Sequence, residues 1–178
     1  WKFSDDTQMT LFCLDAILSH IEYGVMRSRI FDDIYTGFQD WYITQHRTKS
    51  SVGSSGKSGL SNIRSMYAVE APGNTCIQSL GSNKRGSVKA PLNDSKGCGG
   101  IMRTAPIAFL DASVYEVFEF ASEQAAMTHG HPSAYLSAGY FAAVLKNLLL
   151  NKSYESVCDT LRAIITTYKT EQNSNEID

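Results

Sequence analysis

Two adjacent carboxylates lie near the start of the sequence, in the segment Ser4–Asp5–Asp6–Thr7. Carboxylates flanked by hydroxyl groups provide hard oxygen ligands, which suit Mg²⁺, Mn²⁺ or Ca²⁺ better than zinc or copper. The same residue types also fit the start of a helix, where a serine caps the first turn and acids interact favourably with the helix dipole. On these four residues alone the helix cap is the commoner explanation, and both interpretations stay open.

A second candidate for chemistry is the glycine-rich segment 93–103, which reads NDSKGCGGIMR. Its three glycines allow the backbone to approach a ligand closely, so that successive N–H groups can converge on an anion. A serine hydroxyl, Lys96 and Arg103 would add hydrogen-bonding capacity and positive charge. The alternative is a tight loop between two helices. The segment is not a dinucleotide-binding fingerprint, because no strand precedes it and the G-x-G-x-x-G spacing is absent.

The third candidate is Thr128–His129–Gly130–His131–Pro132, which we expect at a break between two helices. Two histidines separated by one residue could bind a metal or contact a ribose or a base, although a structural or solvated pair is more common. Residues 52–58, VGSSGKS, resemble a phosphate-binding P-loop only superficially. Two residues separate the glycines where four are needed, and no hydrophobic strand leads into the segment.

Apolar residues that recur every three or four positions predict helices, and no strand-turn-strand pattern is visible. In the first expected helix these residues run from Met9 to Ile21, and in the second they include Ile30, Phe38 and Trp41. The expected helices cover residues 7–22, 26–46, 63–70, 113–126, 133–150 and 153–168. We therefore predict an all-α fold in a single domain spanning residues 1–178. The segment 50–61, mostly serine and glycine, is expected to be a loop.

Composition excludes several classes of protein. The chain has 178 residues, 43% of them hydrophobic, and a formal charge of −2, which indicates a globular domain without the basic surface that nucleic acids require. No apolar run reaches the roughly 18 residues of a membrane span. The four cysteines are widely spaced and form no C-x-x-C pair, and no secretory leader is visible. We expect a protein of the reducing cytoplasm, without membrane or nucleic-acid partners.

The segments 4–9, 71–75, 93–106 and 128–132 together resemble the ADP-ribosylglycohydrolase family. Each motif alone is weak, but all four occur in the family's order and at suitable spacing, and the resemblance extends from residue 3 to residue 168. It implies a compact all-α fold with two metal ions, Mg²⁺ or Mn²⁺, in a cleft. It also implies a hydrolase that removes ADP-ribose from a modified protein side chain by cleaving the bond at the anomeric carbon.

The resemblance carries specific roles onto residues of this sequence. It implies that Ser4, Asp5 and Asp6 are metal ligands, and that Asp5 and Asp6 are also the catalytic carboxylates, either of which could act as the base. His129 matches a position close to the adenosine part of the ligand. The residues that match the loop around the diphosphate and its neighbouring ribose are Ser95, Lys96, Gly97, Cys98, Gly99 and Gly100. The expected partner is an ADP-ribosylated protein or ADP-ribose itself.

Two features of the family are missing from this sequence. A glycine-rich motif with an acidic metal ligand normally precedes the Ser-Asp-Asp-Thr segment, and an Asp-x-Asp-Thr or Asp-x-Asp-Ser motif normally completes the metal sites near the end. We therefore expect a fragment of a protein about 100 residues longer, catalytically incomplete by itself. Two alternatives to a hydrolase stay open: a pseudoenzyme that binds ADP-ribose without turnover, and a structural protein built on the same scaffold.

Overall fold

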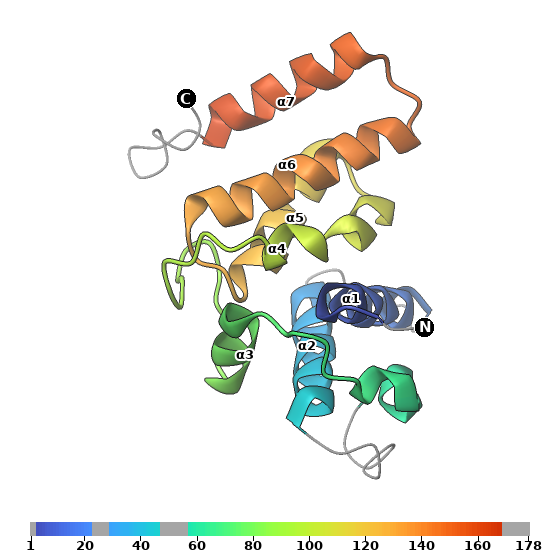
Figure 1. Ribbon diagram of the computed structural model, residues 1–178. Helices are drawn as coiled ribbons and strands as arrows, with labels where there is room; N and C mark the ends of the chain where they lie inside the picture. Colours follow the sequence, from blue (N-terminus) through green and yellow to red (C-terminus); the bar gives the residue numbers. More distant parts are fainter. Residues whose placement is uncertain (1–2, 23–28, 47–56, 169–178) are drawn as a thin grey trace.

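The computed structural model describes residues 3–22, 29–46 and 57–168, and every regular element within these ranges is a helix (Figure 1). The α-helices are α1 (Asp5–Glu22), α2 (Ile30–His46), α3 (Asn74–Gly81), α4 (Gly99–Met102), α5 (Val114–Ala126), α6 (Pro132–Leu149) and α7 (Tyr154–Tyr168). Three short 3₁₀ helices, η3 (Gly59–Asn62), η4 (Arg64–Tyr67) and η5 (Ala105–Phe109), lie in the connections. The predicted all-α class is confirmed.

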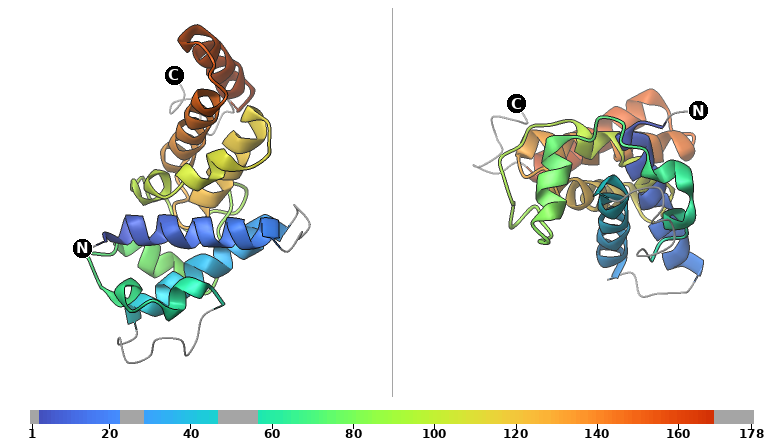
Figure 2. Two further views of the ribbon diagram at one scale, coloured as in Figure 1. Left: turned by 90° about the vertical axis from the view of Figure 1, so that its right-hand side faces the viewer. Right: turned by 60° about the horizontal axis from the view of Figure 1, so that its bottom comes forward.

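Helix α1 lies in the middle of the molecule, between α2 and α3 on one side and α5, α6 and α7 on the other (Figures 1 and 2). Helices α5 and α6 pack along one another, and α7 covers the outer side of α6. Contacts of α1 with η5 and α4 join the two halves. The loop that carries α4 is therefore held against the N-terminal helix, which brings the glycine-rich segment close to the acidic one.

The main core forms where the apolar stripes of α1 and α2 meet. Met9, Phe12, Phe38 and Trp41 are completely buried there, at the three- and four-residue spacing that lines one side of a helix. Burying each such side chain contributes about 1.5–3 kcal/mol. Ile21, which the same periodicity assigned to this face, is instead 60% exposed, because the last turn of α1 extends past the core.

Side-chain caps fix where α5 and α6 begin. The Ser113 hydroxyl accepts the N–H of Glu116 at 3.2 Å, and the Glu116 carboxylate accepts the Ser113 N–H at 2.8 Å, which completes a capping box. Helix α6 begins with Pro132 in its first turn, and the His131 ring accepts the N–H of Ser133 at 3.1 Å. These starts agree with the helices predicted over 113–126 and 133–150.

Other predictions differ from the structure. The helix expected over 63–70 is reduced to the 3₁₀ turn η4, and α3 was not predicted. Helix α3 has only eight residues, and its buried apolar side chains, Cys76 and Leu80, are too few to produce a visible period. The first residues of the helix expected from residue 26, and most of the 50–61 loop with its P-loop-like segment, lie outside the described residues. None of the described helices is both long and apolar enough to cross a membrane.

The close approach of α5 to α6 depends on Gly139. A Cβ atom at this position would lie 2.3 Å from the Ser122 hydroxyl and 2.8 Å from the Phe118 carbonyl oxygen. We therefore expect Gly139→Ala to lower the free energy of unfolding by about 1–3 kcal/mol, although alanine normally favours a helix. Urea denaturation would measure the change. Gly59→Ala is the matched control, because nothing lies within 4 Å of its Cβ; equal effects of both variants would contradict this account.

Candidate functional site

Ser4 is the N-cap of α1, and the two acids occupy the first turn. The Ser4 hydroxyl accepts the N–H of Thr7 at 3.2 Å and lies 3.1 Å from the Thr7 hydroxyl. Ser4 is exposed, whereas Asp5 is buried and Asp6 is partly buried. The helix-cap interpretation is thus correct for this segment. The cap also fixes two adjacent carboxylates at one end of the helix, so it does not compete with a role for them in binding a cation.

Asp5 joins α1 to the segment 71–75. Its Oδ2 accepts the backbone N–H of Gly73 at 3.1 Å, which fixes one carboxylate oxygen of the pair. Asp6 has no such anchor among the described residues, and burial raises the pKa of its carboxyl group above the usual value. The neighbouring Asp5 charge raises this pKa further, while the positive charge of Arg103 acts in the opposite direction. The two carboxylates therefore lie where the positive charge of Arg103 only partly offsets their mutual repulsion.

Asn93 organises the start of the glycine-rich loop. Its Oδ1 accepts the N–H of Ser95 at 3.0 Å and that of Gly130 at 3.2 Å. Its Nδ2 donates to the Ser79 hydroxyl at 3.0 Å and to the Thr128 carbonyl at 2.9 Å. The bonds to Gly130 and Thr128 hold the loop against the segment 128–132, and the bond to Ser79 holds it against α3. The bond to Ser95 is local. Sequence reasoning included Asn93 in the segment but gave it no role; the Asn-x-Ser pattern of an Asx turn was the available signal.

The glycines of the loop permit its contact with His129 and α5. A Cβ on Gly97 would lie 3.1 Å from His129 Nε2, and one on Gly99 would lie 3.2 Å from His129 Cε1. A Cβ on Gly100 would lie 2.9 Å from the Cβ of Ala125. The separations from His129 are tighter than most Cβ contacts in proteins, and the separation from Ala125 is shorter than real Cβ contacts show, so side chains at these positions would require the loop or its neighbours to shift. The glycines therefore allow the loop to lie close to His129 and α5, whereas the close approach predicted from the sequence was to a ligand.

The loop presents several hydrogen-bond donors. Within the described part of the chain, the backbone N–H groups of Cys98, Gly99 and Gly100 have no acceptor. The Ser95 hydroxyl lies 3.0 Å from the Thr75 hydroxyl and accepts the N–H of Gly97 at 3.3 Å. Cys98 is a free, exposed thiol. Three successive free N–H groups beside a hydroxyl form a site that suits an anionic oxygen.

Arg103 occupies a different place from the one that its sequence position suggested. We expected it to add positive charge to the ligand loop, but its side chain is 0% exposed and points into the protein. Its guanidinium lies 4.4 Å from the centre of the Phe38 ring and donates to the Thr128 hydroxyl at 2.7 Å. It also contacts the Cys76 sulfur at 3.3 Å. Arg103 therefore acts on a surface ligand only through its field and through these neighbours.

The two histidines of the 128–132 segment have separate surroundings. His129 is 2% exposed, and its Nδ1 lies 2.8 Å from the Thr128 hydroxyl. Burial, and then the charge of Arg103, lower the pKa of His129 to about 4, so the ring is neutral near pH 7. His131 caps α6, and its Nε2 lies 3.8 Å from Asp94. The alternative of a joint metal site at these histidines has no support from this arrangement.

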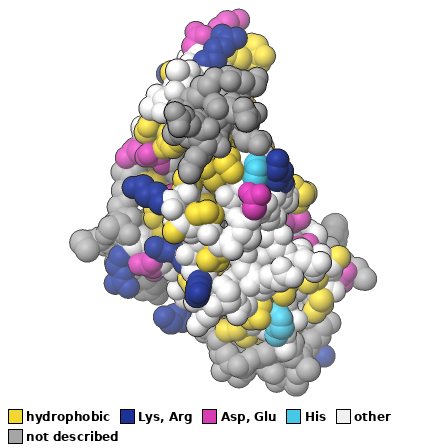
Figure 3. All heavy atoms as spheres, turned by 90° about the vertical axis from the view of Figure 1, so that its left-hand side faces the viewer, with side chains coloured by type: hydrophobic (Ala, Val, Ile, Leu, Met, Phe, Trp, Pro, Cys, Tyr) yellow, Lys and Arg dark blue, Asp and Glu magenta, His cyan; other side chains and the backbone are white. Residues whose placement is uncertain are grey.

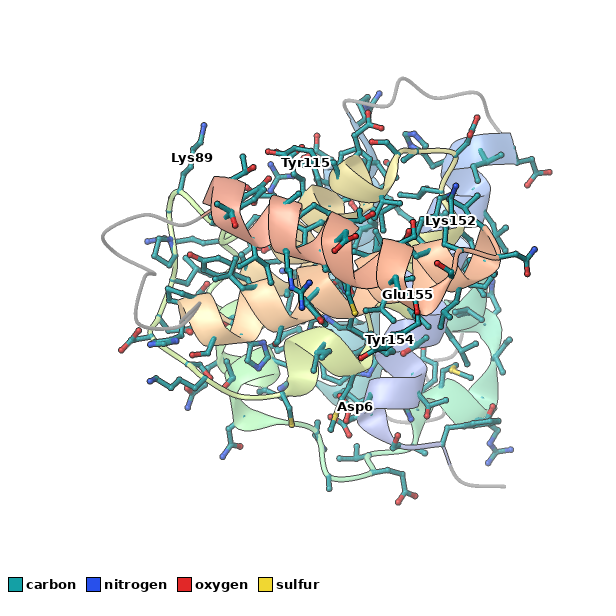
Figure 4. All side chains as sticks on the ribbon, turned by 90° about the horizontal axis from the view of Figure 1, so that it is seen from above. Asp6, Lys89, Tyr115, Lys152, Tyr154 and Glu155 are labelled. Carbon is teal, nitrogen blue, oxygen red and sulfur yellow. The ribbon has the colours of Figure 1, made fainter. Side chains whose placement is uncertain are left out.

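These segments meet in one corner of the molecule, although they are far apart in the sequence. The hydroxyl of Thr10 on α1 donates to the Asp6 carbonyl at 2.8 Å and lies 3.4 Å from the Met102 carbonyl oxygen, which places the first turns of α1 beside α4. Figure 4 shows Asp6 at this junction. The Thr75–Ser95 and Asp5–Gly73 contacts attach the segment 71–75 to both sides. We therefore assign the Asp5–Asp6 pair, the glycine-rich loop and His129 to one candidate site.

Metal ligands and surface charge set limits on this site. Among the described residues, no group of three or more His, Cys, Asp or Glu side chains converges in the manner of a protein metal centre. The pair Asp5 and Asp6 with Ser4 therefore supplies only part of an octahedral shell.

Elsewhere, acidic side chains lie between basic ones on the face shown in Figure 3. This mixed surface does not form the broad basic stripe typical of nucleic-acid binding.

Comparison with known proteins agrees with this geometry. The sequence model of the ADP-ribosylglycohydrolase family matches residues 1–177, and the chain therefore belongs to that family. Proteins of this family are generally hydrolases and typically depend on metal ions. No curated protein and no solved structure matches the chain.

The raised pKa of Asp6 predicts a pH-dependent stability of the metal-free protein. A carboxyl group with a raised pKa in the folded state stabilises the fold below its unfolded pKa, near 3.8, and this contribution is lost as the pH rises. We therefore expect Asp6→Asn to be more stable than the wild type at pH 7, with the difference shrinking towards pH 3.5. Thermal denaturation in EDTA across this range would measure it. Asp111→Asn, at an exposed carboxylate, is the control; a destabilised Asp6→Asn at pH 7 would contradict the prediction.

Proposed function

We propose that this protein is a metal-dependent ADP-ribosylglycohydrolase that releases ADP-ribose from a modified protein side chain. Water would add to the anomeric carbon of the ribose, and the bond from that carbon to the side chain would break. The products would be free ADP-ribose and the restored side chain. The observation that carries the proposal is the meeting of the Asp5–Asp6 pair with the glycine-rich loop and His129 in one corner.

The acidic corner fits a hard divalent cation such as Mg²⁺ or Mn²⁺. Ser4, Asp5 and Asp6 provide oxygen donors of the required type, and no described basic side chain forms an ion pair with either carboxylate. Burial, and then the adjacent charge of Asp5, raise the pKa of Asp6, so a bound cation would offset an electrostatic cost there. When bound, such an ion supplies Lewis-acid chemistry. The other ligands would be water, ribose hydroxyls or further protein groups, and family membership implies two ions in all.

The two carboxylates have different surroundings, which suggests different tasks. Asp5 is buried and its Oδ2 is held by the Gly73 N–H, so it is suited to fix a ligand in one position. Asp6 is more accessible and has a raised pKa, which moves it towards the range useful for accepting a proton from water. We therefore assign the role of general base to Asp6 and the role of fixed ligand to Asp5.

The glycine-rich loop would bind the diphosphate. The free N–H groups of Cys98, Gly99 and Gly100 can donate to phosphate oxygens, Ser95 can contribute its hydroxyl, and exposed Lys96 adds a positive charge. His129 adjoins the same loop and would contact the nucleoside side of the ligand. Binding energy from this end of the substrate orients the anomeric carbon near the carboxylates, which favours reaction at that carbon.

A second candidate function is binding of ADP-ribose without hydrolysis. It is favoured by the small number of acidic groups at the corner, because two carboxylates and a hydroxyl do not fill two octahedral shells. Titration calorimetry with ADP-ribose separates the two functions. Equal affinity with and without Mg²⁺ favours the binding module, whereas an affinity that depends on the metal favours the hydrolase.

Two wider assignments belong to the same proposal. All four cysteines are free, as expected for a protein of the reducing cytoplasm. The described elements also share continuous packing from α1 to α7, which supports a single ADP-ribosylglycohydrolase domain over residues 1–178.

The hydrolase proposal predicts the effect of removing either carboxylate. We expect Asp5→Ala and Asp6→Ala each to reduce kcat about 100-fold or more, since loss of a metal ligand or base removes several kcal/mol of transition-state stabilisation. Release of ADP-ribose from an ADP-ribosylated protein, measured with added Mg²⁺ in the longest available form of the protein, tests this. Asp159→Asn, at an exposed carboxylate on α7, is the control. Activity within twofold of the wild type in either alanine variant would remove that residue from its assigned role.

Metal binding also has a readout that does not depend on activity. A divalent ion that binds only the folded chain stabilises it by about 2.7 kcal/mol at 100 times its dissociation constant. We expect Mg²⁺ or Mn²⁺ to raise the thermal midpoint of the wild type but not those of Asp5→Asn and Asp6→Asn. Differential scanning fluorimetry against EDTA measures this shift. An equal shift in the wild type and both variants would place the ion elsewhere.

A further inference from the structure

A buried chain of contacts connects Arg103 with His129. The guanidinium Nη2 of Arg103 donates to the Thr128 hydroxyl oxygen at 2.7 Å, and this hydroxyl lies 2.8 Å from His129 Nδ1. Arg103 and Thr128 are both 0% exposed, and His129 is almost completely buried. Bulk water therefore does not reach these contacts, and the Thr128 hydroxyl depends on its two neighbours for hydrogen bonds.

The donor and acceptor roles in this chain follow from chemistry. A guanidinium has donors only, so the Thr128 oxygen is the acceptor in its contact with Arg103. The hydroxyl oxygen could accept a second hydrogen bond, but its own proton would then lack an acceptor, since within the described residues His129 Nδ1 is the other polar atom in contact with it. Nδ1 must accept that proton. In a neutral ring the second nitrogen, Nε2, consequently carries the hydrogen.

The protonated nitrogen faces the glycine-rich loop. An added Cβ would lie 3.1 Å from His129 Nε2 at Gly97 and 3.4 Å from it at Gly99, and no side chain occupies that space because both residues are glycine. The Ser95 hydroxyl lies 3.3 Å from the same Cβ position at Gly97. The imidazole thus offers one N–H donor to the side of the loop that also carries Ser95.

We propose that Arg103 and Thr128 are positioning residues that hold His129 as the neutral tautomer protonated on Nε2, so that a ligand on loop 95–100 meets a fixed hydrogen-bond donor. That the ligand is ADP-ribose rests on the proposed function, whereas the tautomer can be tested without any ligand. Because Nε2 carries a hydrogen in this tautomer, a ligand oxygen that accepts a hydrogen bond is favoured beside it, and a ligand group that donates one is disfavoured.

The electrostatic surroundings support the same state of the ring. Arg103 is the charged group that lowers the pKa of His129, after burial, and no described carboxylate forms an ion pair with His129. Cys76 on α3 also lies beside Gly99, at 3.4 Å from its added Cβ, and burial raises the pKa of its thiol, which keeps it uncharged. Lysine could not reproduce these contacts, because Nη2 of Arg103 donates to the Thr128 hydroxyl and the Gln124 carbonyl while the separate Nη1 contacts the Met9 and Cys76 sulfurs.

The first experiment examines the ring itself. Nitrogen-15 NMR of the ligand-free chain, with His129→Gln to assign the signal among the four histidines, distinguishes the two neutral tautomers and the charged ring. We expect the wild type to show the proton on Nε2 from pH 8 down to about pH 5. A proton on Nδ1, or a charged ring at pH 6, would overturn the proposal.

The second experiment removes the connection without changing the volume of the side chain. We expect Thr128→Val to give a mixture of tautomers and to bind ADP-ribose about tenfold more weakly, whereas Thr128→Ser, which keeps the hydroxyl, restores both properties. Thr44→Val is the matched control, since Thr44 is equally buried and its hydroxyl donates to the Trp41 carbonyl within α2 at 2.7 Å, away from the imidazole. Circular dichroism confirms that each variant is folded.

The outcomes separate this inference from the proposed function. Wild-type tautomer and affinity in folded Thr128→Val would overturn the inference, and so would an equal loss of affinity in Thr44→Val. If Thr128→Val fails to fold, the tautomer of His129 in the wild type and in Thr128→Ser still tests the inference, because a proton on Nδ1 in either protein would overturn it. A wild-type chain that keeps the proton on Nε2 yet binds no ADP-ribose supports the assignment of the buried chain and overturns the proposed function instead.

Discussion

The arrangement of the candidate site depends on one buried cation. The guanidinium of Arg103 has no carboxylate partner among the described residues, and the Phe38 ring, the Cys76 sulfur and the Thr128 hydroxyl surround it. A buried charge is costly unless its donors are satisfied, so these groups must keep their positions relative to one another. They come from α2, α3 and the segment after α5. The cation therefore fixes the framework beneath the glycine-rich loop, while its field reaches both Asp6 and His129.

Close backbone approach is the second constraint, and it explains where glycine is needed. Gly100 rests on α5 and Gly37 lets α2 approach α1, where an added Cβ would lie 2.9 Å from the Phe12 carbonyl oxygen. Because Gly97 and Gly99 have no side chains, the loop can lie close to the His129 ring and leaves that side of the ring open to a ligand. The same residue type thus performs two tasks, which are tight packing between helices and the opening of a binding surface over a buried side chain.

The sequence predicted the features that depend on local chemistry. The helices expected over 113–126 and 133–150, together with the apolar period of α1 and α2, gave the places of four long helices, and the order of four motifs indicated the family. It did not predict α3, whose apolar face is too short, or the inward direction of Arg103. A basic residue in a glycine-rich loop normally suggests surface charge, and only the packing of Phe38 and Thr128 beneath it shows the opposite. The connection from Arg103 to His129 is tertiary, so no local pattern could reveal it.

The close approach of Gly130 to the Asn93 backbone bears on the order in which parts of the chain fold. A Cβ on Gly130 would lie only 2.0 Å from the Asn93 carbonyl oxygen, and the Asn93 amide spans the same gap to the Thr128 carbonyl. These partners are more than thirty residues apart, and the whole of α5 lies between them. Since closing so long a loop costs entropy before any contact rewards it, α5 and α6 should pack early in folding. The glycine-rich loop would then acquire its final shape among the last events, on a surface that already exists.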